Sequence, residues 1–499
     1  MLKIPKVSEI IVVVALLVFY SFLLSQPINF STADLGRHLK NGELFFQKFQ
    51  IPNTNLYSYT YPDQPFINHH WGSGAIFYLV HLAFGFSGIS ILFIILSLVT
   101  FLIFFHVAKK EGGLWTATIL AVIALPVIAY RAEIRPEIFS YLLASIFFWI
   151  LWNYQQDKIP KKSLYFLPII TAVWVNLHIY FFLGGVLVLA FLLENAWRKL
   201  IYKDHKALSK IKSLAIILLT LAPAVLLNPS GLKGALYPLK IFEDYGYKLF
   251  ENQSFFFIEK LFAYPPAFYF KILFIISLLT WLVVFSKAVK KKTQFNLGLF
   301  SLWFFFSFLG LTAVRNFTIF GYFAFAISSI NLGELALIKI GSRYKRFLPI
   351  FLVIFVFAIT MSANPAFWQS RQSFGLGLQK NVLDAAEFFK KNNLHGPVFN
   401  NYDVGGYLIY NLYPQEKVFV DNRPEAYPAS FFQETYVPMQ ENKEKWLEVN
   451  KKYNFQTIFF WRNDLTPWGQ KFLSQRINDP AWALVFADNY HLIFIKKSN

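Results

Sequence analysis

Long apolar runs recur along the first 363 residues, and they constrain the fold more than any other feature of the sequence. An α-helix rises 1.5 Å per residue, so about 20 apolar residues cross the roughly 30 Å hydrocarbon layer of a membrane. The sequence predicts about eleven membrane-spanning helices, at residues 8–25, 86–107, 114–130, 137–154, 163–176, 180–197, 213–227, 270–286, 294–314, 317–337 and 347–363. No small-residue cleavage site follows the first run, which therefore predicts a retained anchor and not a removed signal peptide.

The charged residues agree with a membrane protein. Only 15% of the residues are charged, against about 25% in an average soluble chain, and this depletion excludes disorder and an ordinary cytosolic enzyme. The net charge of +19 comes from Lys and Arg clustered in short loops between apolar runs, which is a topology signal and argues against a nucleic-acid partner. The absence of Cys excludes disulfides, thiolate metal sites and cysteine nucleophiles.

The distribution of Lys and Arg predicts the orientation. With the N-terminus inside, the short inner segments hold 21 Lys and Arg residues and the longer outer segments hold 11. Short loops rich in Lys and Arg lie on the cytoplasmic side of a membrane. We therefore expect a protein of the inner (plasma) membrane with a cytoplasmic N-terminus and an external, periplasmic C-terminal region.

Two outer loops, 26–71 and 228–269, are too long to be simple connectors, and loops of this length are usually functional. The segment 72–84 is too short to span and predicts a juxtamembrane or re-entrant helix. We therefore expect a mostly α-helical fold, a polytopic transmembrane bundle over residues 1–363.

After residue 363 the composition becomes that of a soluble protein, and 364–499 is predicted to be an external α/β domain. Helical periodicity predicts helices at 381–392, 405–412 and 443–452. Short apolar runs predict extended segments at 397–400, 417–421 and 457–461, and the stretch 483–496 predicts two strands around an Asp-Asn turn.

The first outer loop carries the strongest cluster of reactive side chains. Asp34 follows the first span by a few residues, where a carboxylate can act as a general base or help to hold a divalent cation. Asp34 and His38 would share one helix face. A structural alternative is that Asp34 caps a helix and that Arg37, His38 and Lys40 are solvated. Two adjacent histidines, His69 and His70, could ligate a metal, but no further ligand has diagnostic spacing, so we expect no protein metal site.

A second cluster lies between the third and fourth spans, where Arg131 and Arg135 alternate with carboxylates. Two arginines at an interface can hold a phosphate or pyrophosphate. The alternative is that the segment is structural and begins a helix. It is a strong alternative, because Pro136 and Glu137 suit the first turn of a helix.

The remaining candidates are single polar residues at the outer ends of spans, each weak alone. The predicted topology puts them on the same membrane face as Asp34, as an anionic lipid-linked substrate would require; they are Asn176, His178, Lys233 and Arg315. Mid-span charges are scarce, which argues against an ion-coupled transporter.

Two segments of the predicted external domain are weaker candidates. They are NNYDVGGY at 400–407 and DNRPE at 421–425. Both are read first as turn-forming structure and second as sites that contact a sugar or a partner.

Several stretches together resemble the GT-C superfamily, polytopic glycosyltransferases that use polyprenyl-phosphate-linked sugars, such as protein O-mannosyltransferases, aminoarabinose transferases and oligosaccharyltransferases. The resemblance is closer still to bacterial GT-C-like membrane proteins and covers nearly the whole chain. The stretches are DLGRHLKNGE, IPNTNLYSYT, NHHWGS, RPEIFSYLL, NLHIYFFLG, LNPSGLKGALYPLK, VRNFTIF and YDVGGYLIYNLYPQEKVFVDNRPEAY.

The resemblance implies a sugar transfer in which Asp34 is the catalytic base, with a polyprenyl-phosphate sugar as donor, a glycan, lipid or protein as acceptor, and membrane lipids around the bundle. This chain departs from the pattern at His70, where the closer group often has Glu, and in having no acidic residue paired with Asp34. A divalent cation, Mg²⁺ or Mn²⁺, is compatible with these residues but not demanded by them. Two alternatives remain: a non-catalytic protein that binds a lipid carrier or assembles the cell envelope, and a transporter of lipid-linked glycans.

Overall fold

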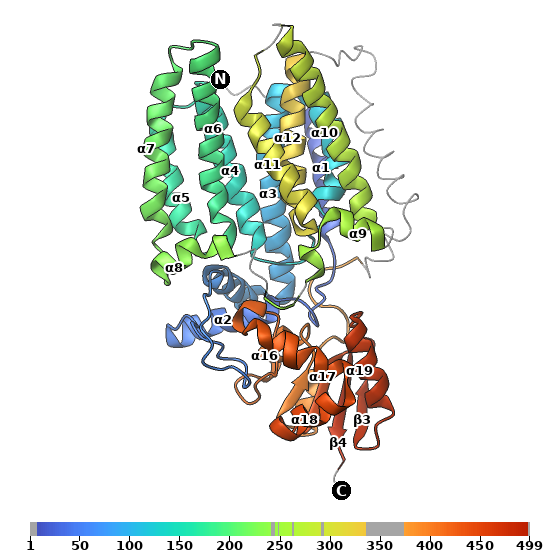
Figure 1. Cartoon of the computed structure of the whole chain (residues 1–499). Coiled ribbons are helices and arrows are strands. Elements are labelled where there is room, and N and C mark those ends of the chain that lie inside the picture. Colours follow the sequence, from blue (N-terminus) through green and yellow to red (C-terminus); the bar gives the residue numbers. More distant parts are fainter. Residues whose placement is uncertain are drawn as a thin grey trace.

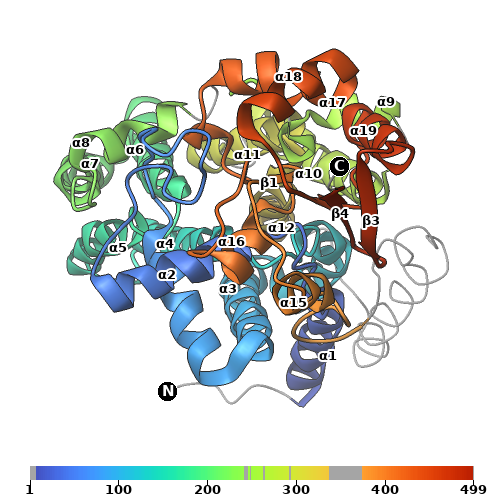
Figure 2. The same ribbon diagram turned by 90° about the horizontal axis from the view of Figure 1, so that it is seen from below.

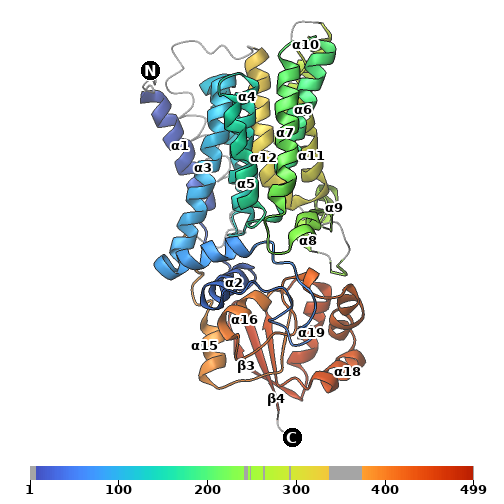
Figure 3. The same cartoon turned by 90° about the vertical axis from the view of Figure 1, so that its left-hand side faces the viewer.

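A computed structural model gives the architecture of the chain and describes residues 7–240, 245–247, 249–261, 264–290, 294–335 and 374–497 (Figure 1). Long helices run side by side in a bundle, and a small α/β unit made by the C-terminal residues lies against one end of it (Figure 3). The helix α1 begins at the opposite end of the bundle from the α/β unit.

The bundle consists of apolar helices whose bounds follow the predicted runs. They are α1 (Val7–Leu24), α3 (Trp71–Ile128), α4 (Glu137–Gln155), α5 (Phe166–Trp174), α6 (Phe182–Ile201), α7 (Ala207–Val225), α10 (Pro265–Val289), α11 (Leu297–Thr312) and α12 (Phe317–Leu335). Among the described residues, five helical segments are long and apolar enough to cross a membrane, and α1 and α11 are shorter apolar helices. The chain is a multi-pass membrane protein. The predicted run 347–363 lies outside the described residues.

Two glycines divide α3 into three parts. Gly85 (φ 63°) and Gly113 (φ 82°) adopt left-handed backbone conformations that interrupt the helix, and glycine has no Cβ to oppose them. The first part, before Gly85, corresponds to the predicted juxtamembrane segment and lies across the end of the bundle in Figure 3. Its exposed Leu82 and Phe84 suit a position at a membrane surface.

Short helices fill the connections of the bundle. Those of the two long loops and of the turn before α12 are α2 (Leu35–Lys48), α8 (Gly231–Leu236), η3 (Tyr237–Lys240), η4 (Phe250–Asn252), α9 (Phe255–Leu261) and η5 (Val314–Asn316). The 3-10 helices η1 (Lys161–Tyr165) and η2 (Ile179–Phe181) directly precede α5 and α6.

The α/β unit is built around a four-stranded sheet, seen from below in Figure 2. The strand order is β1-β2-β4-β3, with β1 parallel to β2 and the other pairs antiparallel. Its elements are α15 (Asp384–Lys391), β1 (Val398–Asn400), α16 (Gly405–Leu412), η6 (Pro424–Ala426), the π-helix η7 (Phe431–Tyr436), α17 (Pro438–Glu441), α18 (Lys443–Tyr453), β2 (Thr457–Trp461), α19 (Pro467–Ile477), β3 (Trp482–Ala487) and β4 (His491–Lys496).

One predicted extended segment of this unit, 417–421, is not a strand of the sheet. Val418 instead forms an isolated parallel bridge with Ser58 of the first outer loop. The Val418 N–H donates to the Tyr57 carbonyl at 3.0 Å, and the Tyr59 N–H donates to the Val418 carbonyl at 3.2 Å. The backbone groups of Val418 are therefore satisfied by the first outer loop, which joins the bundle to the α/β unit.

The hydrophobic core continues from the bundle into the α/β unit. Phe30, at the start of the first outer loop, packs edge-on against Tyr407 and Tyr410 of α16 at centroid distances of 6.0 and 5.1 Å. Phe30 and Tyr407 are fully buried. This packing fixes α16 against the segment that leads into α2, and it brings the α/β unit next to Asp34.

Candidate functional site

Asp34 lies where the bundle, α2 and the α/β unit meet. It occupies the N-cap position of α2, but its side chain makes no capping hydrogen bond. Its Oδ1 accepts a hydrogen bond from the amide of Asn422 at 2.5 Å, and its Oδ2 lies 3.4 Å from Nη1 of Arg135. The carboxylate is thus used in contacts with distant parts of the chain and not as a cap.

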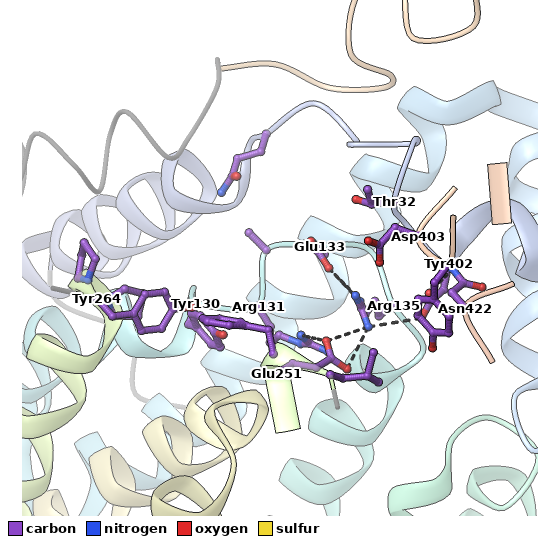
Figure 4. Close-up of a pocket in the computed structure, with 17 residues that line it drawn as sticks. Thr32, Tyr130, Arg131, Glu133, Arg135, Glu251, Tyr264, Tyr402, Asp403 and Asn422 are labelled. Atoms are coloured by element: carbon purple, nitrogen blue, oxygen red, sulfur yellow. Dashed lines mark hydrogen bonds and ion pairs between the residues drawn. The ribbon is translucent and has the colours of Figure 1, made fainter. Parts of the chain in front are cut away.

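Arg135, which pairs with Asp34, belongs to a network of arginines and carboxylates, part of which Figure 4 shows. It pairs with Glu133 at 2.9 Å and with Glu251 at 3.1 Å. Arg131 also reaches Glu251, at 2.7 Å, and forms a two-pronged contact with Glu137 at 3.0 and 3.1 Å. Carboxylates therefore already neutralise these arginines. An incoming anion would have to replace a carboxylate as the partner of an arginine.

Arg315 closes this network from the other side. It lies 3.3 Å from Glu137 and 4.0 Å from Glu251, and its guanidinium stands over the Tyr180 ring at 5.7 Å. Glu137 begins α4, as predicted.

Among the described residues, two cavities are lined by both Asp34 and Arg135. The Tyr264 cavity, of about 590 Å³, is lined by Asp34, Arg131, Arg135, Asp403 and the Tyr264–Pro266 start of α10. The histidine cavity, of about 140 Å³, shares Asp34, Arg135, Glu251 and Asn422 with it.

The Lys233 cavity, of about 770 Å³, shares Tyr237 and Glu425 with the histidine cavity. Asp34 stands in the wall common to the Tyr264 and histidine cavities.

Four histidines gather in the histidine cavity. The His70 ring lies 5.5 Å from His38, 3.9 Å from His69 and 5.1 Å from His178, between centroids. Burial lowers the pKa of His69 and of His178 to about 3 and holds the pKa of His38 and His70 well below its ordinary value. All four rings are neutral near pH 7, and each can both donate and accept a hydrogen bond.

Arg37 and His38 are buried, contrary to the alternative in which they are solvated side chains. The Nη1 of Arg37 and the Nδ1 of His38 have no hydrogen-bond partner among the described residues. Both residues line the histidine cavity, so polar groups are available there to a ligand.

The electrostatic surroundings favour a basic carboxylate. Burial raises the pKa of the Asp34 carboxyl above its ordinary value, and the charges of Arg135 and Arg37 oppose this rise. Burial, and then the charge of Asp464, raises the pKa of Asp403 in the Tyr264 cavity to about 7. For Glu251 the neighbouring arginines outweigh burial and hold the pKa below its ordinary value.

Two predicted site residues lie away from Asp34. Asn176 accepts a hydrogen bond from the Trp71 indole at 2.8 Å and donates to the carbonyls of Ala172 and Leu227, so it ties three segments together. Lys233 is exposed and lines the Lys233 cavity. The other predicted residues line the Tyr264 cavity or the histidine cavity; they are Arg37, His38, His69, His70, Arg131, Arg135, Glu137, His178 and Arg315.

Sequence reasoning missed one residue of the site and ranked two others low. Glu251 lies in the second outer loop, whose length and aromatic content marked it as functional without indicating this residue. Asp403 and Asn422 belong to segments that were interpreted first as turns. The available signals were an acidic residue beside glycines after a strand, at Asp403, and an amide after a predicted extended segment, at Asn422.

The described residues contain no group of three or more His, Asp or Glu side chains arranged to hold a metal ion. Asp34 is engaged by Asn422 and Arg135, and the nearby Glu133 and Glu251 are engaged by arginines. This arrangement does not fit a resident divalent cation.

The same fold occurs in membrane enzymes of known structure. The chain superimposes on the oligosaccharyltransferase AglB of Archaeoglobus fulgidus, in complex with an inhibitory peptide and a dolichol-phosphate, with a TM-score of 0.60 at 12% identity, over 91% of this chain and 69% of that one. It superimposes on apo ArnT of Cupriavidus metallidurans with a TM-score of 0.54 at 11% identity, over 97% of both chains. The chain has a GT-C fold.

ArnT bound to undecaprenyl phosphate gives a TM-score of 0.52 at 12% identity, over 98% of both chains. No protein-family model and no curated protein sequence matches the chain. The GT-C fold, with its helical bundle and C-terminal sheet, is therefore established by structural similarity, as the resemblance in sequence led us to expect.

Proposed function

We propose that this chain is an inverting glycosyltransferase that moves a sugar from a polyprenyl-phosphate donor to an acceptor hydroxyl. The observation that carries the proposal is the carboxylate of Asp34, with Arg135 against it, in the wall common to the Tyr264 and histidine cavities. Two structurally similar proteins were solved with dolichol-phosphate or undecaprenyl phosphate, which supports a donor of this class.

The donor phosphate would lie near Arg135 in the Tyr264 cavity. Arg135 is 19% exposed and lines both cavities, whereas Arg131 is 8% exposed and lines the Tyr264 cavity but not the histidine cavity. The polyprenyl chain would leave this cavity past the apolar residues at the start of α10 and lie between helices. Arg315 would add positive charge from the histidine cavity.

The chemistry follows from these positions. Asp34 takes the proton of the acceptor hydroxyl, and the acceptor oxygen attacks the anomeric carbon and forms the new C–O bond. The bond from the anomeric carbon to the phosphate oxygen breaks, and polyprenyl phosphate leaves with the electron pair. Arg135 stabilises the negative charge that develops on the phosphate. A single displacement inverts the anomeric configuration.

The histidine cavity would receive polar groups of the sugar or the acceptor. Its neutral imidazoles, Arg37 and Glu425 offer donors and acceptors to hydroxyl groups. The acceptor would be a glycan, a lipid or a protein, and Lys233 would contact it in the adjoining Lys233 cavity. Asn176 would act by positioning Trp71.

We further propose that the site faces the outer side of the inner membrane. The Lys and Arg bias supports this orientation, and α1 begins at the end of the bundle away from the α/β unit. The transmembrane domain would comprise residues 1–363, and the external domain would comprise residues 364–499.

The test is transfer by purified protein in nanodiscs, with a panel of polyprenyl-phosphate sugars and NMR of the product. Transfer with inverted anomeric configuration supports the proposal, whereas retained configuration contradicts a single displacement. Donor binding without transfer from any donor would instead favour a non-catalytic protein that binds the lipid carrier.

A further inference from the structure

The contact between Asp34 and the α/β unit has a defined polarity. The Nδ2 of Asn422 donates to Oδ1 of Asp34 at 2.5 Å, and the Oδ1 of Asn422 accepts from Nε of Arg37 at 3.4 Å. Arginine has no acceptor and an ionised carboxylate has no donor. The Asn422 amide can therefore face these two neighbours in only one orientation.

The segment that carries Asn422 is held from the first outer loop. Asp421 and Arg423 form a fully buried pair, with Nε of Arg423 at 2.7 Å from Oδ1 of Asp421. Arg423 also donates to the side chain of Asn55 at 2.6 Å and stands over the Phe66 ring at 4.7 Å. Because buried contacts hold both neighbours of Asn422, the backbone position from which its side chain extends is also held.

Two glycines allow the two elements to approach each other. A Cβ on Gly36 of α2 would overlap the backbone carbonyl of Gly406 in α16, and a Cβ on Gly406 would come within 3.1 Å of Nδ2 of Asn422. Helix α16 therefore contacts α2 backbone to backbone, and this close approach brings Asn422 within reach of Asp34.

We propose that Asn422 is a positioning residue, supplied by the α/β unit, that orients the Asp34 carboxylate for proton transfer. This inference rests on the proposed function. By occupying Oδ1 of Asp34, the amide leaves Oδ2 to receive the acceptor proton; among the described residues Oδ2 has only the 3.4 Å contact with Arg135. The bundle alone then lacks a correctly oriented base, and the active site is complete only when the α/β unit is docked.

The test compares Asn422→Ala and Asn422→Asp with wild type, and with Asn463→Ala, which removes an exposed amide of the same unit. Asn422→Ala is expected to lower kcat roughly 10- to 100-fold, part of what a positioned base contributes, with little change in KM for the donor. In Asn422→Asp a second carboxylate faces Oδ1 of Asp34. The acid limb of its pH profile is expected to move to higher pH, with activity recovering as the pH rises.

A second measurement does not depend on turnover. Infrared difference spectra against Asp34→Asn follow the titration of the Asp34 carboxyl, which is expected at higher pH in both Asn422 variants because a hydrogen bond to the ionised form is lost. If wild type transfers no sugar but this shift occurs, the proposed function fails while the contact between Asn422 and Asp34 is upheld. Active wild type with unchanged kcat, pH profile and titration in both variants would overturn the inference.

Discussion

At the scale of single residues, the reactivity of Asp34 is set by opposing influences. Burial favours its protonated form, whereas Arg135 and Arg37 favour its ionised form. A base needs a raised pKa to accept a proton, but it must still be ionised at the working pH. Arg135 is therefore expected to affect both the leaving phosphate and the base.

Replacing Arg135 by Gln is expected to shift the acid limb of the pH profile to higher pH. The positive charge of Arg135 lowers the pKa of Asp34, so its loss raises that pKa, and Asp34 becomes protonated at a higher pH than in wild type. The measurement is kcat/KM between pH 5 and 9. The control is Arg462→Gln, an exposed arginine of the α/β unit, whose profile should match wild type. An unshifted or acid-shifted limb in Arg135→Gln would contradict this assignment.

Arg423 stabilises the α/β unit through its buried ion pair with Asp421. Replacing it by Leu leaves the fully buried Asp421 without its charge partner, and the expected cost is about 3–5 kcal/mol in the free energy of unfolding. The measurement is the midpoint of thermal unfolding in detergent. The double variant with Asp421→Asn should regain part of the loss, since the uncompensated charge is then absent. Equal midpoints for Arg423→Leu and wild type would show that the pair is not needed.

At the scale of elements, local patterns predicted what depends on local sequence. Helix α16 has the predicted bounds 405–412, because its apolar periodicity and its preceding turn are local signals. The segment 417–421 has the composition of a strand but pairs with Ser58, and no local pattern contains that partner. The same holds for Asp34, whose contacts with Arg135 and Asn422 join residues 101 and 388 positions apart.

The contact between α2 and α16 gives a prediction at this scale. Gly36→Ala places a methyl group against the Gly406 carbonyl, and such overpacking costs about 1–3 kcal/mol. We expect a lower unfolding midpoint and a loss of transfer, because displacement of α16 moves Asn422 away from Asp34. Gly185→Ala in α6 is the matched control, since its Cβ would meet no atom within 4 Å. Full activity of Gly36→Ala would mean that the close approach is dispensable.

At the scale of the whole molecule, the apolar runs predicted the helical bundle and the change of composition predicted the α/β unit. They could not predict how the two parts meet, because docking depends on the packing of Phe30, Gly36 and Gly406, which carry no periodic signal. The candidate site was predicted as a set of residues on one membrane face. Asp403 and Asn422 lay in segments that were interpreted first as turns, and Glu251 became visible only in three dimensions.

The proposed orientation can be tested directly, because the chain contains no Cys. A single Cys at exposed Asp63 in the first outer loop should react with an impermeant maleimide in right-side-out vesicles. A single Cys at exposed Lys206, between α6 and α7, should react only in inside-out vesicles. The opposite labelling pattern would place the α/β unit in the cytoplasm.

The central claim is that Asp34 is the base of the transfer. The most direct measurement compares sugar transfer and donor binding for wild type, Asp34→Asn and Asp63→Asn, in which an exposed carboxylate of the same loop is removed. The predicted result is a loss of transfer on the order of 100- to 10,000-fold in Asp34→Asn, with donor binding retained and with Asp63→Asn unaffected. Equal transfer by Asp34→Asn and wild type would contradict the claim and remove Asp34 from the chemistry.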